Sequence, residues 1–108
     1  MAIPHAQPGQ VLDLRPLGPA VATTKTATLV KTSTLELIRL VLPAGKEIAE
    51  HKVAGEITVQ CLEGEVEFTG AGKTQTLKAG QLVYLGGNES YAVRAVTDAS
   101  VLVTILLR

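Results

Sequence analysis

The sequence predicts an all-β protein, a small sandwich or barrel with little or no helix. Short apolar runs recur along the chain, and turn signals rich in glycine or proline separate them roughly every 8–12 residues. Many of the apolar residues are β-branched, which favours strands over helices. Only 3% of the 108 residues are aromatic and none is tryptophan. The core must therefore be built mainly from valine, leucine, isoleucine and alanine.

Length and charge limit the classes of protein that fit. A chain of 108 residues has room for one domain and one core. Ten basic and ten acidic residues give a net charge of zero, and no basic stripe is present, so we expect no nucleic-acid partner. A single cysteine excludes an internal disulfide and suits a reducing compartment.

Nothing in the sequence predicts a membrane or secretory segment. The N-terminus lacks the basic and apolar regions of a signal peptide. The longest apolar stretch, residues 101–107, is far shorter than the roughly 20 residues that span a bilayer. We therefore expect a cytoplasmic protein with no membrane partner.

Residues 1–34 are expected to form an extended arm and edge strands that pack on a barrel of residues 35–108. Four of the five prolines lie near the N-terminus, where they oppose helix formation. The alternation in residues 11–15 predicts an edge strand, which would pair with its own sheet or with a neighbouring subunit. A helical turn is expected near residues 20–24, and a strand around residues 28–31.

The barrel strands are predicted in order after this arm. Residues 35–42 form a strand ended by a Pro-Ala-Gly turn, and a short strand carrying His51 follows. Gly70-Ala71-Gly72 is expected to form a hairpin loop. The other expected strands are residues 57–62, 65–69, 73–77, 81–85, 91–96 and 100–107.

Two stretches carry a distinctive spacing. In the first, Gly45 is followed by five residues and His51, and the stretch ends at Gly64. In the second, Gly80 is followed by five residues, then Gly-Gly-Asn-Glu-Ser-Tyr and an apolar strand. These spacings, with the hairpin between them, resemble those of a small single-domain cupin. The resemblance covers residues 35–107 and implies a double-stranded β-helix, also called a jelly-roll barrel.

The resemblance also implies where a metal would sit. In the cupin family, two histidines and a glutamate of the first motif and a histidine of the second bind one divalent metal. The corresponding positions here hold His51, Val53, Ile57 and Tyr91, so one ligand of four is kept. We therefore expect no catalytic metal and assign no catalytic residue. The alternative is a divalent transition metal held by His51 and non-standard ligands.

Glu56 and Cys61 are the candidates for such ligands. Strand alternation puts Ile57, Val59 and Cys61 on one face and Glu56 on the other, so Glu56 could reach the site only through a bulge at Gly55. Cys61 could supply a thiolate, but a lone cysteine among apolar residues is also typical of a core.

We hypothesise that a polar pair of His51 and Tyr91 replaces the metal, because a buried phenol needs a partner. The predicted ligand pocket consists of His51, Val53, Ile57, Val59, Cys61, Tyr91 and Val93. Arg39 and Arg94 lie in otherwise apolar strands. Each either faces solvent or points inward, where it would clamp an anion.

Three functions remain open at this stage. The first is a metal-free module that binds a small, mostly apolar molecule. The second is a metal-dependent enzyme of the dioxygenase or isomerase type. The third is a structural homodimer whose barrel is filled by its own side chains. The resemblance implies a homodimer in any case, because small cupins commonly pair through sheet edges.

Overall fold

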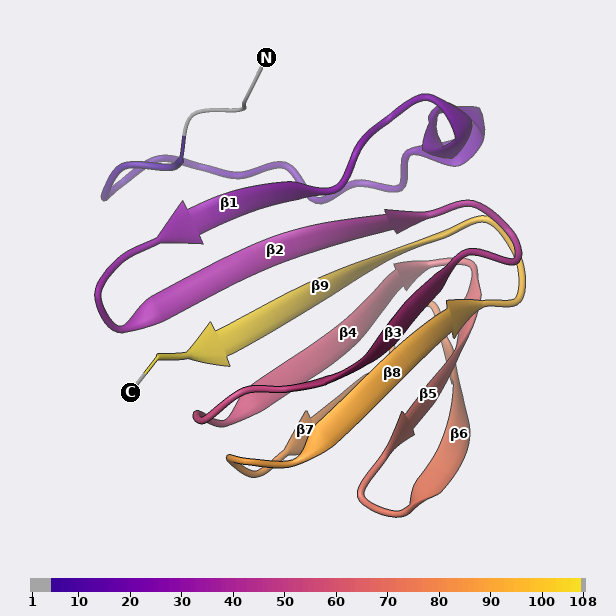
Figure 1. Cartoon of the computed structure of the whole chain (residues 1–108). Coiled ribbons are helices and arrows are strands. Elements are labelled where there is room, and N and C mark those ends of the chain that lie inside the picture. The colour runs from indigo at the N-terminus through magenta and orange to yellow at the C-terminus, as the bar shows by residue number, and fades with distance from the viewer. Residues whose placement is uncertain (1–4, 108) are drawn as a thin grey trace.

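The computed structural model describes residues 5–107, and this part of the chain is mainly β-sheet (Figure 1). Within residues 5–107, nine strands form two antiparallel sheets. The helical content of these residues is one short 3₁₀ helix, η1 (Gly18–Ala22). The prediction of an all-β jelly-roll barrel with little helix is confirmed. No helix in the described residues is long and apolar enough to cross a bilayer.

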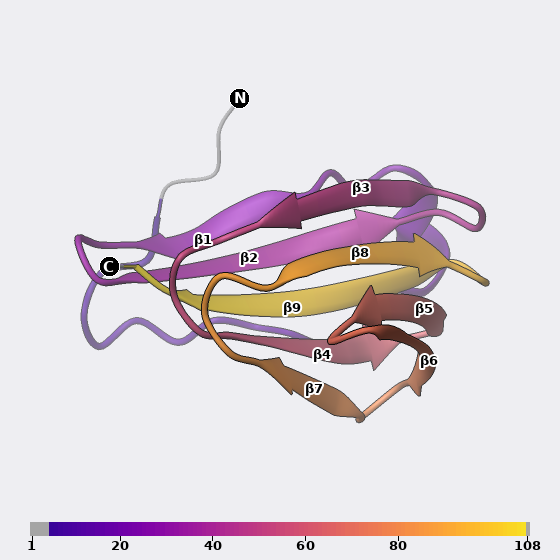
Figure 2. The same ribbon diagram turned by 60° about the horizontal axis from the view of Figure 1, so that its bottom comes forward.

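The chain crosses repeatedly between the two sheets, and consecutive strands stay in one sheet only at β1–β2 and β5–β6 of the described residues (Figure 2). The five-stranded sheet has the order β1 (Ala27–Lys31), β2 (Leu35–Leu42), β9 (Ala99–Leu106), β4 (Ile57–Glu63) and β7 (Leu82–Leu85). The four-stranded sheet has the order β3 (Glu47–Lys52), β8 (Ser90–Ala95), β5 (Glu65–Gly70) and β6 (Lys73–Lys78). The predicted strands of the barrel lie within one or two residues of these bounds.

The core lies between the sheets, and every second side chain of each central strand points into it. On β9, Val101, Val103 and Ile105 are at most 5% exposed, while the residues between them face the other way. Phe68 is completely buried and is the largest of the fully buried side chains. Burial of each such aliphatic or aromatic side chain stabilises the fold by about 1.5–3 kcal/mol.

The edge strand predicted at residues 11–15 does not form with the chain's own sheets, and its pairing with a neighbouring subunit stays a prediction. The segment forms no strand, although the arm does meet β1 where the Ala6 amide donates to the Leu29 carbonyl at 2.8 Å. The Asp13 carboxylate accepts hydrogen bonds from the amide and Nε of Arg15 at 3.0 and 2.8 Å. Such local side-chain bonds offer the backbone an alternative to a ladder.

A buried polar cluster fastens the arm to the outer face of the five-stranded sheet. The Glu63 carboxylate, at the end of β4, accepts hydrogen bonds from the amides of Leu17 (2.9 and 2.8 Å) and Gly18 (2.9 Å). It also accepts one from the Ser100 hydroxyl at 2.6 Å and pairs with Arg39 at 3.3 Å. We call Arg39, Glu63 and Ser100 the arm latch.

Arg39 completes the latch and faces away from the barrel interior. Its Nη2 donates to the Arg15 carbonyl at 2.7 Å and to the Ser100 hydroxyl at 3.0 Å, and the residue is 8% exposed. The alternative in which Arg39 clamps an anion inside the barrel is therefore wrong.

The latch keeps Glu63 ionised. Burial alone would raise the pKa of this carboxyl. The hydrogen bonds from Leu17, Ser100 and Gly18 and the charge of Arg39 outweigh burial, so the pKa is lowered overall. A lowered pKa in the folded state stabilises the fold above the ordinary carboxyl pKa, and this stabilisation is lost as the pH falls through the folded value.

We expect Glu63→Gln to lower the free energy of unfolding by roughly 2–4 kcal/mol, because it leaves the Arg39 guanidinium buried without a counter-charge. Chemical denaturation at pH 7 measures this loss. Between about pH 5 and pH 3 the parent should lose stability more steeply than the variant, since only the parent carries the Glu63 carboxylate.

Glu67→Gln is the matched control, because Glu67 pairs with Arg94 on the exposed face of the other sheet. Glu67→Gln should lower the free energy of unfolding by less than about 1 kcal/mol. Equal losses in the two variants would contradict the role assigned to the latch.

Candidate functional site

Two neighbouring strands of the four-stranded sheet bring His51 and Tyr91 together. In the pairing of β3 with β8, His51 lies opposite Tyr91 and Ile48 lies opposite Val93. The register shifts between Ile48 and His51, and this bulge lets both residues share the inward face despite their odd spacing. The ring centroids of His51 and Tyr91 are 4.4 Å apart, with an interplanar angle of 54°.

The two rings differ in burial and hydrogen bonding. Tyr91 is 3% exposed and stacks on Phe68 at 6.0 Å, whereas His51 is exposed. The Nδ1 atom of His51 lies 3.2 Å from the Ala49 carbonyl oxygen. Because a carbonyl only accepts, Nδ1 carries the proton in this hydrogen bond, and in the neutral ring Nε2 is then an acceptor.

The Tyr91 hydroxyl makes no hydrogen bond to any residue in the range 5–107, including His51. The predicted hydrogen-bonded pair is therefore a contact between rings. In this range only the Arg39 Nε is a fully buried side-chain nitrogen or oxygen without a partner, so the Tyr91 hydroxyl keeps some access to solvent. Burial, and secondly the negative charge of Glu36, raise the pKa of Tyr91. The phenol thus stays protonated and can donate.

Aliphatic side chains surround the inner side of this pair. Val53 is half-buried and packs on the core, and Ile57 is 2% exposed. Val59 and Val93 are at most 1% exposed. The structure thus places these predicted pocket residues on the inner side of the barrel.

Cys61 lies away from the pair. It is four residues beyond Ile57 on β4, a displacement of about 13 Å along a strand. Its buried thiol donates to the carbonyls of Glu63 and Gly64 at 3.3 and 3.4 Å, and burial raises its pKa. Cys61 is a core residue at the other end of the barrel and does not complete a ligand set with His51.

Glu56 faces away from His51. Its carboxylate accepts a hydrogen bond at 2.6 Å from the hydroxyl of Tyr84, whose residue is 58% exposed on the outer side of β7. The outward direction expected from strand alternation is what the structure shows. Across residues 5–107 no three histidine, cysteine, aspartate or glutamate side chains gather as a metal site.

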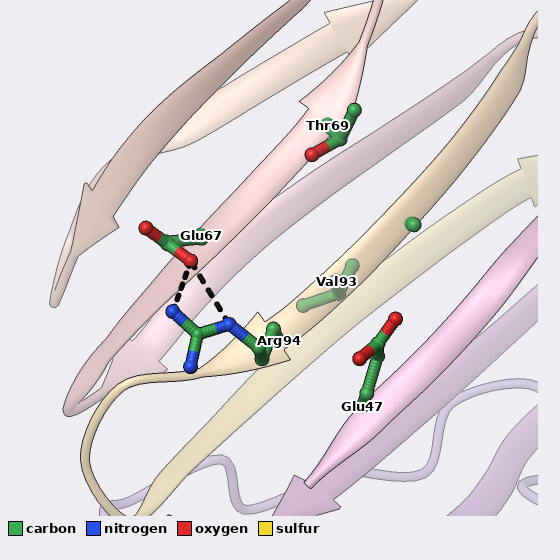
Figure 3. Close-up of a pocket in the computed structure, with 6 residues that line it drawn as sticks. Glu47, Glu67, Thr69, Val93 and Arg94 are labelled. Atoms are coloured by element: carbon green, nitrogen blue, oxygen red, sulfur yellow. Dashed lines mark hydrogen bonds and ion pairs between the residues drawn. The ribbon is translucent and has the colours of Figure 1, made fainter. Parts of the chain in front are cut away.

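The outer face of the four-stranded sheet carries a polar hollow of about 200 Å³ (Figure 3). Arg94 of β8 pairs with Glu67 of β5, and Glu47 of β3 lies on the other side of Arg94 in the strand register. Arg94 therefore faces outward, and the inward anion clamp is wrong for it too. An exposed ion pair of this kind contributes about 1 kcal/mol or less.

Another hollow, of about 230 Å³, lies on the outer face of the five-stranded sheet. It is lined by Glu56, Ile57, Thr58, Tyr84, Thr104 and Leu106. Neither of these two outer hollows is lined by His51 or Tyr91. The predicted pocket residues are instead packed in and around the barrel core.

The comparisons with known proteins agree with this geometry. The sequence profile of the cupin domain matches residues 38–106. The chain belongs to the cupin family. No functionally curated protein matches this cupin.

Solved structures show the same fold over most or all of the chain. A conserved Streptococcus pyogenes protein of unknown function is 24% identical, with a TM-score of 0.78 over 100% of this cupin and 96% of that chain. An RmlC-like cupin from Methanocaldococcus jannaschii is 20% identical, with a TM-score of 0.75 over 94% of both chains. A predicted oxalate decarboxylase from Thermotoga maritima is 28% identical, with a TM-score of 0.69 over 77% of this cupin and 79% of that chain.

The sequence analysis assigns no role to Glu63 or Glu36. The local signal for Glu63 is a carboxylate directly before a glycine at the end of a strand. Glu36 lies in the strand predicted at residues 35–42. Its inward position follows from the same alternation that places Ile38 and Leu40 in the core.

The triple change Val53→His, Ile57→Glu and Tyr91→His should create a metal site absent from the parent. The substitutions restore two histidines and a carboxylate around His51 on the inner face, which is a ligand set suited to divalent transition metals. Titration with Co²⁺, followed by visible absorption and calorimetry, measures the gain.

His51→Ala in the triple variant is the control and should abolish the Co²⁺ signal. A folded triple variant that binds no metal would show that the alignment of the motif is wrong.

Proposed function

We propose that this cupin is a binding module that takes a small, mostly apolar molecule at the barrel end marked by His51 and Tyr91. The observation that carries the proposal is the Tyr91 hydroxyl. It belongs to a residue that is 3% exposed, yet no described residue accepts its hydrogen bond. Because this hydroxyl is not among the fully buried unpaired atoms of the described residues, it is open to a hydrogen bond with water or with a ligand that displaces the water.

The surrounding groups support a ligand with an apolar body and one polar group. Val53, which is half-buried, offers aliphatic surface on the inner side, and the ring of His51 flanks Tyr91. The phenol donates and His51 Nε2 accepts, which suits a hydroxyl group. We propose no reaction for this site.

We further propose that binding does not use a resident metal. Valine, isoleucine and tyrosine occupy three of the four positions where the family places ligands, and Glu56 and Cys61 are directed elsewhere. One imidazole falls short of the three protein ligands of a catalytic zinc site. A stoichiometric transition metal found by elemental analysis of protein purified without chelators would favour the metal-dependent enzyme instead.

A neutral probe, 1-butanol, tests the binding site. We expect it to shift the side-chain NMR signals of His51 and Tyr91, and Tyr91→Phe to weaken the binding about fivefold, because one hydrogen bond is worth roughly 1 kcal/mol. Tyr84→Phe removes the same atom from the outer face and serves as the control. If 1-butanol shifts no signal of His51 or Tyr91, the proposal fails.

We also propose that two copies of the chain associate through the outer face of the five-stranded sheet. Leu82, Tyr84 and Leu106 on this face are 54%, 58% and 45% exposed. The threonines Thr58 and Thr104 lie between the last two. The Glu56 carboxylate borders this surface and accepts the hydrogen bond of Tyr84, and the threonines and leucines beside it are uncharged. Two such largely uncharged surfaces can meet about a twofold axis.

Leu106→Glu should convert the dimer to a monomer, because two new carboxylates would face each other in a desolvated interface. Size-exclusion chromatography with light scattering measures the mass. Val11→Glu is the matched control, since Val11 is 90% exposed on the arm, and it should leave the mass unchanged. A parent protein that is monomeric at high micromolar concentration would exclude the dimer.

A further inference from the structure

Glu36 stands on the inner face of the barrel at the end where Tyr91 and His51 lie. On β2 it alternates in phase with Ile38, Leu40 and Leu42, all of which pack on or belong to the core. Across the sheet it lies opposite Ile105, which is 5% exposed. The Glu36 side chain is 20% exposed. A carboxylate at an inward position is costly unless something binds it.

The position of Glu36 relative to Tyr91 follows from two observations. Ile105 pairs with Ile57 at the start of β4, so Glu36, Ile105 and Ile57 form the last inward layer of the five-stranded sheet. Tyr91 lies near the start of β8 in the facing sheet, and the hydrogen bond from the Asn88 amide to the Val53 carbonyl at 2.9 Å joins the loop before it to the segment that leads into Ile57. Burial, and secondly the charge of Glu36, raise the pKa of Tyr91, which agrees with this placement. We call Glu36, His51 and Tyr91 the mouth residues.

The protein itself satisfies only part of the Glu36 carboxylate. Lys31 donates from Nζ to Oε1 at 3.2 Å and is 46% exposed. An ion pair this open to solvent is worth about 1 kcal/mol or less. No residue in the range 5–107 donates to the second oxygen, Oε2. This oxygen is free to accept from a ligand.

Each mouth residue therefore offers one acceptor. These are Glu36 Oε2, the Nε2 of neutral His51 and the hydroxyl oxygen of Tyr91. A primary ammonium has three donors and no acceptor, which matches this set. The negative charge of Glu36 favours a cation, and the faces of aromatic rings attract cations as well. Among the ion pairs of the described chain, Lys31 is the cation paired with Glu36, and the carboxylate already neutralises it.

We infer that the ligand of this site is a small primary amine with an apolar body, and that Glu36 selects it over carboxylates of the same size. The inference rests on the proposed binding function and adds the chemical class of the ligand. Glu36 is the specificity residue, and Lys31 is an internal cation that the ammonium competes with.

Three probes of equal length test the inference: butylamine, 1-butanol and butyrate, titrated at pH 7.5 and followed by the NMR signals of His51 and Tyr91. Butylamine should bind at least about tenfold more tightly than butyrate, a difference of about 1.4 kcal/mol. Glu36→Gln should remove most of this preference.

Lys31→Met is the second variant, because it frees the same carboxylate without changing a mouth residue. It should strengthen butylamine binding about threefold to tenfold, as expected when a competing ion pair worth about 1 kcal/mol is removed. Circular dichroism and thermal melting check that both variants fold. If Glu36→Gln does not fold, the effect of Lys31→Met on butylamine binding decides whether Glu36 binds the ammonium.

The outcomes distinguish the inference about amines from the proposed binding function. Butyrate binding as tightly as butylamine, or an unchanged preference in Glu36→Gln, overturns the inference about amines. In that case 1-butanol binding that still depends on Tyr91 leaves the proposed function standing. If none of the three probes shifts a signal of His51 or Tyr91, both fail.

Discussion

The antiparallel register of β2, β9 and β4 is the constraint on which the rest of this cupin depends. Each of these strands shows one set of side chains to the barrel interior and the other set to the outside. On the inside the register stacks aliphatic side chains in layers. On the outside it brings Arg39, Ser100 and Glu63 from three strands into one cluster. A slip of one residue would exchange the two sets and destroy both.

The arm latch shows how the outer set supports the fold. A carboxylate, a guanidinium and a hydroxyl are buried together, and their mutual hydrogen bonds offset the cost of removing them from water. The backbone amides of Leu17 and Gly18 in the arm donate further hydrogen bonds to the Glu63 carboxylate. The N-terminal arm is therefore held in place without forming a strand between residues 11 and 15.

The chemistry of the barrel differs between its two ends. One end holds Cys61 as a buried thiol among aliphatic residues, beyond the reach of His51. The other end holds an imidazole, a phenol and a carboxylate, each with a hydrogen-bonding atom that no described residue uses. Val53 and Ile57 bring only aliphatic groups to this end, whereas His51, Tyr91 and Glu36 keep it polar. This asymmetry directs the proposals to that end.

The sequence by itself determined the fold class, the strand positions in the barrel and the inward face of Ile57, Val59 and Cys61, because strand periodicity and glycine spacing are local properties. The resemblance of its motifs to those of cupins also implied that His51 and Tyr91 lie together. Only the tertiary structure decided that Arg39 and Arg94 face outward, that Glu63 holds the arm and that Glu36 faces inward at the barrel end where Tyr91 lies. Those facts depend on which strands pair across the sheets and where the register shifts, and such long-range pairings are not encoded in any short stretch of the chain.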